Sequence, residues 1–228
     1  MKVSRNTVIE EIGVMDGRTE LCGMFAVPDN AKGIVLFAHG SGSSRNSPRN
    51  RRVASELNQA GFATLLFDLL DEEEATDREK VFDIPLLAHR LQIAAHWIKH
   101  QPRAENFPLG FFGASTGAGA ALWAAAEMGQ EVSAVVSRGG RPDLAGPKLD
   151  QVTAPTLLIV GSEDEPVITM NRDALVHLRK GKLILVPGAT HLFEEPGTIE
   201  MVSAHAITWF DRYLKSKAIR GEKAKKAA

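Results

Sequence analysis

Short apolar segments alternate with longer amphipathic segments along most of this chain, and that alternation limits its fold more than any other feature. The apolar segments have the length and composition of buried strands, and they lie at residues 33–38, 62–69, 109–113, 132–137, 156–161 and 182–186. Segments typical of helices lie at residues 47–60, 85–100, 116–128, 167–180 and 199–215. Strands that alternate with helices predict an α/β fold, in which a mostly parallel sheet carries helices on both faces.

The two ends of the chain differ from this alternating pattern. Residues 7–12 and 21–27 are typical of two opening strands, for which we expect an antiparallel hairpin. The C-terminal residues are rich in lysine and poor in apolar side chains, as in a solvated, flexible terminus. We therefore expect one α/β domain over residues 1–214 and a basic C-terminal tail over residues 215–228.

Charge and cysteine content exclude several classes of protein. The 228 residues carry a formal net charge of −1 and the sequence pI is about 6.7, whereas a nucleic-acid binder usually has a basic excess. The single cysteine, Cys22, cannot form an internal disulfide, and no apolar segment approaches the roughly 20 residues of a membrane span. The N-terminus lacks the apolar core of a signal peptide. We expect a cytoplasmic protein that binds neither nucleic acid nor membranes.

Residues 113–117 read Gly-Ala-Ser-Thr-Gly and match the G-x-S-x-G pattern of a nucleophile elbow. An apolar strand leads into the pattern and a helix-forming stretch leads out of it, which is the setting that the pattern requires. A nucleotide-binding turn would instead show G-x-G-x-x-G or a Walker lysine, and the sequence has neither here. These features predict Ser115 as a catalytic nucleophile.

A serine hydroxyl needs a base and an acid that orients the base, and in this type of site they follow the serine in the order acid, then histidine. The strand at residues 156–161 ends in an acidic loop, from which we choose Asp164 as the acid, with Glu163 and Glu165 as rivals. The next strand runs into a Pro-Gly-Ala-Thr-His turn, which predicts His191 as the base.

A tetrahedral intermediate also needs hydrogen-bond donors at its oxygen. One donor is expected to be the backbone N–H of Thr116, the residue after the nucleophile. The second is expected from the glycine-rich loop after the strand at residues 33–38, where we choose the N–H of Ser41. His39 is expected to brace this loop.

Arginines gather near the expected rim of the site, and Arg45, Arg138 and Arg141 are candidates for contact with substrate because arginine forks bind carboxylate and phosphate well. The competing interpretation is a set of solvated or structurally paired arginines. The acidic segment at residues 70–83 is a candidate small lid. The remaining connections leave no room for a helical cap domain.

His96 and His100 are one helical turn apart, but the glutamate of the zincin pattern is missing between them. We interpret them as a pair on a helix surface. The sequence therefore predicts no metal site.

Six segments together resemble the dienelactone-hydrolase-like branch of the α/β-hydrolase superfamily. They occur in order between about residues 33 and 214, and they read HGSGSSRNSPRN, FDLLDEEE, GASTGAGAAL, SRGGRPDL, LLIVGSEDEPV and VPGATHLFEEPG. The resemblance implies the α/β-hydrolase fold, a Ser/Cys–Asp–His triad and no cofactor, and relatives of this type also occur joined to phosphoribosyltransferase domains. Dienelactone hydrolases carry cysteine at the elbow, so Ser115 favours a serine carboxylesterase.

The residues and the resemblance lead to one main functional hypothesis. We expect a serine hydrolase that cleaves small carboxylic esters through an acyl-enzyme, acting on a small-molecule substrate as a monomer or homodimer. An acyltransferase of the same fold is the alternative within the class. A binding protein that kept the fold and lost turnover is the alternative outside it.

Overall fold

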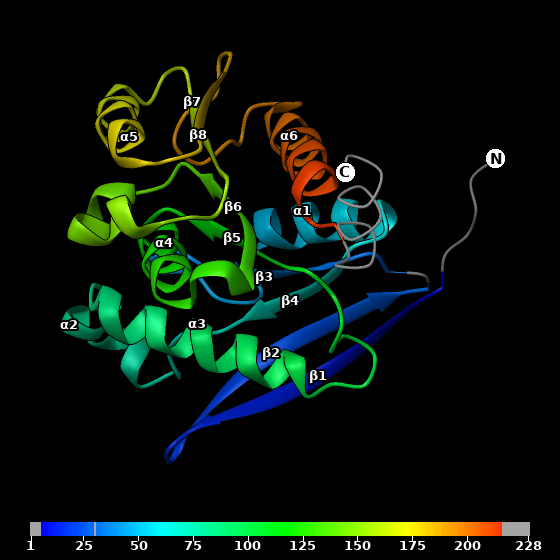
Figure 1. Ribbon diagram of the computed structural model, residues 1–228. Coiled ribbons are helices and arrows are strands. Elements are labelled where there is room, and N and C mark those ends of the chain that lie inside the picture. The colour runs from blue at the N-terminus through cyan, green and yellow to red at the C-terminus, as the bar shows by residue number, and fades with distance from the viewer. Residues whose placement is uncertain (1–5, 30, 216–228) are drawn as a thin grey trace, which may run out of the picture.

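A computed structural model describes residues 6–29 and 31–215, which form an eight-stranded sheet with helices on both of its faces (Figure 1). The strand order is β1-β2-β4-β3-β5-β6-β7-β8. The pairs from β4 to β8 are parallel, whereas the β1–β2 and β2–β4 pairs are antiparallel. The predicted fold class, a mostly parallel α/β sheet of the α/β-hydrolase type, is confirmed.

The N-terminal strands form the expected antiparallel hairpin and extend the sheet at one edge. β1 (Thr7–Asp16) pairs along its whole length with β2 (Thr19–Pro28), and β2 continues onto β4 (Ala63–Phe67). β2 alternates buried and exposed residues over much of its length, because only one of its faces packs against the core.

The central parallel strands are buried on both faces, which explains their continuous apolar sequences. They are β4, described above, β3 (Ile34–Ala38), β5 (Leu109–Ala114), β6 (Val132–Arg138) and β7 (Thr156–Gly161). The last parallel strand, β8 (Gly181–Val186), is the second edge of the sheet, and most of its residues are exposed or partly exposed. Each strand begins and ends within about two residues of its predicted position, and the carboxyl ends of the parallel strands lie along one edge of the sheet.

Helices cover the two faces in separate groups (Figure 1). α1 (Pro48–Gln59) and α6 (Thr198–Tyr213) pack on one face, and α3 (Ile84–Lys99) and α4 (Thr116–Met128) pack on the other. α5 (Glu165–His177) lies beside β7 and β8. Local signals fix the first turn of α1, where Ser47 accepts a hydrogen bond from the Asn50 N–H and Pro48 is the first helical residue.

Three connections contain short helices that the sequence pattern did not indicate. The acidic segment between β4 and α3 forms η1 (Glu74–Thr76) and α2 (Arg78–Val81), the connection between α4 and β6 forms η2 (Gly129–Glu131), and the connection after β6 forms η3 (Pro142–Gln151). In the described part of the chain, no connection is long enough to form a cap domain.

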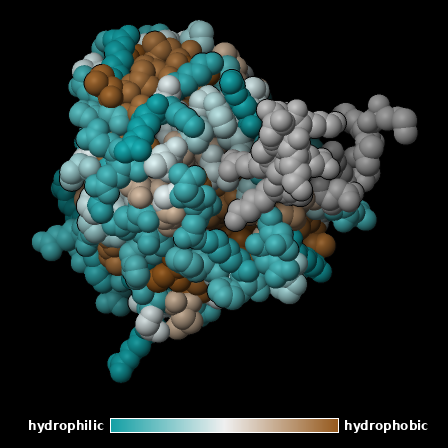
Figure 2. Space-filling model, in the orientation of Figure 1, coloured by the Kyte–Doolittle hydropathy of each residue, from teal (hydrophilic) through white to brown (hydrophobic). Residues whose placement is uncertain are grey.

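The outer surface is mostly hydrophilic, and Figure 2 shows apolar patches that include the region of α5 and β8. Val176 on α5 and Leu185 on β8 are among the exposed apolar side chains there. Within residues 6–29 and 31–215, the helices are all too short or too polar to cross a membrane. The predicted basic tail begins at the last described residue, Lys215, and residues 216–228 lie outside the described part.

Candidate active site

The predicted nucleophile lies on a strained turn between β5 and α4. Ser115 has φ 50° and ψ −123°, a conformation that costs free energy for any residue other than glycine. Its neighbours hold this conformation, because the Ser115 N–H donates to the Arg138 carbonyl at 3.2 Å and the Ser115 carbonyl accepts from the Arg141 N–H at 3.0 Å. The last residue of β6 and the segment after it therefore hold the elbow through two backbone hydrogen bonds to Ser115.

Glycines make the close approach of the elbow to β3 possible. A Cβ added to Gly117 would collide with the carbonyl oxygens of Ala38 and His39, and one added to Gly40 would lie 2.9 Å from the Ser115 Cβ. Real Cβ atoms do not tolerate such contacts. The glycines of the elbow and of the loop after β3 are thus required by packing as well as by backbone conformation.

The predicted base and acid lie together at the ends of β8 and β7. His191 Nδ1 and Asp164 Oδ2 are 2.7 Å apart, and the Asp164 side chain is only 12% exposed. The rival carboxylates face solvent, and Glu163 pairs with the hydroxyl of Ser162. If His191 Nδ1–H donates to Asp164, the other ring nitrogen, Nε2, carries the lone pair that a base needs.

Residues 138 and 139 contact both Ser115 and His191. The Arg138 carbonyl accepts from Ser115, and a Cβ on the next residue, Gly139, would lie 3.1 Å from the His191 carbonyl oxygen and 3.6 Å from His191 Nδ1. In the described structure the Ser115 hydroxyl itself forms no hydrogen bond. Catalytic hydrogen bonds of unliganded enzymes are often long and shorten when substrate binds.

The two expected oxyanion donors, the N–H groups of Ser41 and Thr116, belong to neighbouring residues, and the Ser41 N–H already donates a hydrogen bond. The Ser41 N–H donates to Thr116 Oγ1 at 2.8 Å. Thr116 is the first residue of α4, so its own N–H has no partner within the helix. His39 braces this loop as expected, since its Nε2 accepts from the Leu69 N–H at 3.1 Å and its Nδ1 lies 3.0 Å from the Gly40 carbonyl. Burial lowers the pKa of His39 and favours the neutral ring that this bonding requires.

A cavity of about 320 Å³ opens beside these donors, and Ser41 and Thr116 form part of its lining. The acidic segment between β4 and α3 supplies another part of the wall, chiefly through Leu70, Ala75 and Val81. The volume is at the lower end of the range for small-molecule pockets. The candidate lid is therefore a wall of this cavity in the present structure.

Buried ion pairs hold that wall in place. Arg90 on α3 donates to Glu74 with Nη2–Oε1 at 2.9 Å, to Asp16 at 3.0 Å and to the Leu69 carbonyl at 3.0 Å. The hydrogen bonds from Arg90, joined by one from Lys80, lower the pKa of Glu74 to about 2. The wall is thus tied both to α3 and to the N-terminal hairpin.

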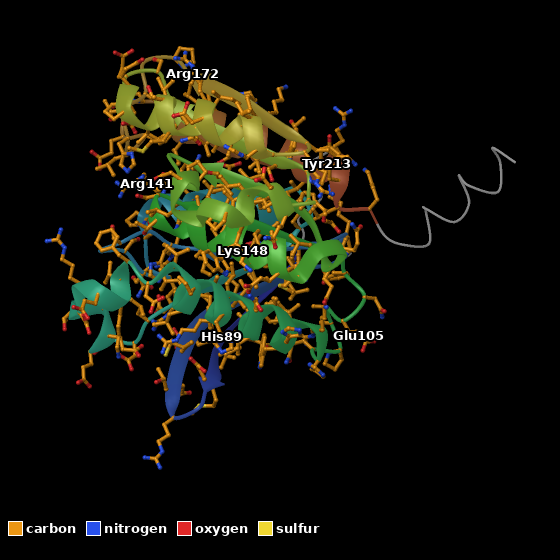
Figure 3. The ribbon with its side chains drawn as sticks, turned by 60° about the vertical axis from the view of Figure 1, so that its left-hand side comes forward. His89, Glu105, Arg141, Lys148, Arg172 and Tyr213 are labelled. Atoms are coloured by element: carbon orange, nitrogen blue, oxygen red, sulfur yellow. The ribbon has the colours of Figure 1, made fainter. Side chains whose placement is uncertain are left out.

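The three arginines expected at the rim have different environments. Arg45 forms an ion pair with Asp68, and Arg141 forms a two-pronged pair with Asp143 at 2.9 and 2.7 Å. Figure 3 shows Arg141 at the surface of the molecule. Arg138 is buried, with 7% of its surface exposed, and no carboxylate of the described residues pairs with it. Arg138 therefore differs from Arg45 and Arg141, each of which has a carboxylate partner.

Sequence reasoning missed two residues that shape this part of the site. Phe193 has φ 56° and is buried against Arg138, so the strained backbone just after His191 carries a large side chain into the core. Asn50, in the first turn of α1, is also buried and accepts a hydrogen bond from Arg138. Positive φ at a phenylalanine has no local sequence signal, and a buried asparagine is not visible in a helical pattern.

The described residues contain no group of three or more His, Cys, Asp or Glu side chains that is suited to a metal ion. His96 and His100 each place Nδ1 2.8 Å from a backbone carbonyl one turn earlier in α3. His89, which Figure 3 shows on the same helix, lies 3.9 Å from Asp16.

Comparisons with known proteins agree on the fold and on the family. A sequence model of the dienelactone hydrolase family matches residues 21–215. The crystal structure of a dienelactone hydrolase from Anabaena variabilis is 54% identical, with a TM-score of 0.89 over 92% of this chain and 99% of that one. Est1E from Butyrivibrio proteoclasticus is 16% identical with a TM-score of 0.75, over 88% of this chain and 96% of that one, and so shows the fold alone.

Longer curated relatives also match. Two Mycobacterium tuberculosis proteins that carry the provisional name of phosphoribosyl transferase are 57% identical over 206 residues. The match covers 90% of this chain, but the chain spans only 46% of the length of those relatives.

Proposed function

The chain belongs to the dienelactone hydrolase family, and on this premise we propose that it is a serine hydrolase that cleaves small carboxylic esters. The proposal is supported by an arrangement in which Ser115 lies on a strained elbow, residues 138 and 139 contact both Ser115 and His191, and His191 Nδ1 is 2.7 Å from Asp164 Oδ2. Strain of this kind persists at functional sites because the surrounding structure enforces it.

In the proposed acylation step, Ser115 Oγ attacks the ester carbonyl carbon while its proton passes to His191 Nε2. Asp164 stabilises the imidazolium through the hydrogen bond to Nδ1. The carbonyl oxygen becomes an oxyanion that accepts from the Thr116 N–H and from the Ser41 N–H, which exchanges its bond to Thr116 Oγ1 for this one. Collapse of the intermediate expels the alcohol, which takes the proton from His191.

Deacylation repeats the same steps with water. His191 removes a proton from the water as its oxygen attacks the acyl carbon, and the proton then returns to Ser115 as the acid leaves. An alcohol or amine that replaced water at this point would make the protein an acyltransferase, so an added acceptor that diverts product would identify that activity.

Covalent labelling tests the proposal directly. We expect a fluorophosphonate probe to label Ser115, as mapped by mass spectrometry, and to leave the Ser115→Ala variant unlabelled. Ester hydrolysis should fall in the same variant to the residual level of an enzyme without its nucleophile, a loss of about 10⁴-fold or more. A folded wild-type protein that resisted the probe would contradict the proposal and favour a binding protein without turnover.

A further inference from the structure

The hydroxyl of Thr116 lies where the oxygen of a substrate is expected to bind. Its Oγ1 accepts the hydrogen bond of the Ser41 N–H at 2.8 Å, and this N–H is one of the two backbone donors of the proposed oxyanion hole. Thr116 supplies the other N–H, from the first turn of α4. Oxyanion-hole donors lie about 2.7–3.1 Å from the oxyanion. Relative to the Ser41 N–H, Thr116 Oγ1 therefore occupies the place of an oxyanion.

The same hydroxyl has an unused proton. Thr116 is 3% exposed, and its Oγ1 donates no hydrogen bond to any residue in the described part of the chain. A hydroxyl has one O–H donor as well as its acceptor lone pairs. The proton is therefore available to an acceptor that enters the cavity lined by Thr116 and Ser41.

The backbone around Thr116 keeps this hydroxyl beside the nucleophile. Thr116 directly follows Ser115 on the elbow. The loop that carries Ser41 packs against the elbow, because a Cβ added to Gly40 would lie 2.9 Å from the Ser115 Cβ. An oxyanion that forms on Ser115 and binds the Ser41 N–H therefore forms next to the Thr116 side chain.

The exchange of partners in the proposed acylation step leaves this hydroxyl in need of a new partner. When the Ser41 N–H donates to the oxyanion, Thr116 Oγ1 loses the one hydrogen bond that it makes among the described residues. A buried polar group without a partner costs free energy, and this cost would oppose the transition state. Donation from the Thr116 O–H to the same oxyanion removes the cost and adds a third donor to the two backbone N–H groups.

We propose that the Thr116 hydroxyl is a third donor to the oxyanion, and that in the free protein it occupies the Ser41 N–H in place of the substrate oxygen. The inference rests on the proposed hydrolase function, because it assigns a further catalytic residue to the same site. No covalent bond is made or broken at Thr116, since the hydroxyl rotates, keeps its proton and changes from acceptor to donor. The new hydrogen bond strengthens as charge develops on the substrate oxygen, so it should raise kcat more than it lowers KM.

Substitutions at Thr116 test the donor with phenyl acetate as substrate. Thr116→Val and Thr116→Ala lack the hydroxyl, and we expect each to lower kcat about 10- to 100-fold while changing KM less than about threefold. Thr116→Ser keeps the hydroxyl and should stay within about threefold of the wild-type kcat. Thr64→Val is the matched control and should change neither constant, because it removes a buried hydroxyl of β4 that accepts from Asn58 Nδ2 at 3.0 Å.

A thionoester separates donation from bracing of the Ser41 loop. O-phenyl thioacetate has sulfur in place of the carbonyl oxygen of phenyl acetate, and sulfur is a weak hydrogen-bond acceptor. With protein in excess, so that slow acylation is resolved, we expect Thr116→Val to slow the thionoester less than about threefold. The preference for the oxygen ester should then fall about tenfold or more. Equal losses for both esters would make Thr116 a brace and overturn the donor, and a faster reaction would overturn it by making the hydroxyl a competitor of the substrate.

Fluorophosphonate labelling distinguishes failure of this inference from failure of the hydrolase proposal. Labelling of Ser115 in the wild-type protein, with the same preference between the two esters in wild type and Thr116→Val, would leave the hydrolase standing and overturn the third donor alone. A folded wild-type protein that neither reacts with the probe nor releases phenol from either ester would overturn both.

Discussion

Two buried arginines on opposite faces of the sheet have surroundings that are opposite in kind. Arg90 on α3 has Glu74, Asp16 and the Leu69 carbonyl as partners. Among the residues that the structure describes, the side chain of Arg138 at the end of β6 has the amide oxygen of Asn50, at 3.3 Å, as its one hydrogen-bond partner. The comparison teaches that burial alone does not define the role of a charge. Arg90, whose charge is fully partnered, fixes the wall of a cavity, whereas Arg138 is buried without a carboxylate partner among the described residues.

The largest effect should follow from removing the partnered arginine. Arg90→Met would remove the main partner of the buried Glu74, which keeps the more exposed Lys80, and would also remove a partner of the partly exposed Asp16. We expect it to lower the free energy of unfolding by about 3–5 kcal/mol, because breaking a buried pair leaves an uncompensated charge. Urea unfolding monitored by circular dichroism measures this. A change below about 1 kcal/mol would show that the wall does not depend on Arg90.

The second-largest effect should come from acid, which should weaken the cavity wall that Arg90 and Glu74 hold in place. The pKa of Glu74 is lowered to about 2 from an ordinary value of 4.5, so its contribution to stability is fully present above about pH 4.5 and is lost as the pH falls towards 2. The loss should be on the order of 2–3 kcal/mol. Glu74→Gln provides the control, since its free energy of unfolding should fall less over this range. Parallel pH profiles for the two proteins would contradict the assignment.

A smaller effect should follow from changing the cavity wall without touching a charge. Val81→Phe reduces the cavity beside Ser41 and Thr116, and Val81→Ala enlarges it. We expect Val81→Phe to lower kcat/KM for neutral p-nitrophenyl esters of longer acids about tenfold, and Val81→Ala to favour them. A chain-length series from acetate to octanoate measures this. An unchanged chain-length optimum in both variants would show that the acyl or alcohol group of the ester binds outside this cavity.

The smallest effect should follow from removing the unpartnered arginine. Arg138→Met takes away a buried charge that has no counterion within residues 6–29 and 31–215, and it keeps an apolar side chain of similar length under Phe193. We expect the free energy of unfolding to change by less than about 1 kcal/mol, or to rise, in contrast to Arg90→Met. Urea unfolding of the two variants side by side gives the difference. A loss as large as that of Arg90→Met would remove the distinction between the two arginines.

The candidates for nucleophile, acid and base, and their order along the chain, could be predicted from the sequence because each depends on short-range signals. An apolar strand, a glycine-flanked serine and a small-residue helix stand within twenty residues, and the structure places Ser115 on the strained turn that this pattern predicts. Asp164 and His191 follow later strands, and parallel strands bring their carboxyl ends to one edge. The order of the elements and the candidates for acid and base therefore follow from local pattern and chain direction.

The sequence could not show which of several similar side chains, among the carboxylates and among the arginines, takes part in the site. Asp164 faces His191 while Glu163 and Glu165 face solvent, a difference set by the turn that begins α5. The sequence likewise offered Arg45, Arg138 and Arg141 as equivalents. The structure pairs Arg45 with Asp68, 23 residues away, and gives Arg138 no carboxylate partner among the described residues.

The sequence by itself determined the α/β architecture, the elbow at Ser115 and the order of the triad candidates, because strand and helix periodicity and glycine-rich turns act over a few residues. Only the tertiary structure decided which carboxylate contacts His191, how the acidic segment lines a cavity, and which buried arginine has no carboxylate partner in the described part of the chain. These depend on distances between segments far apart in the chain. Such distances are set by packing of the whole core, and no local pattern encodes them.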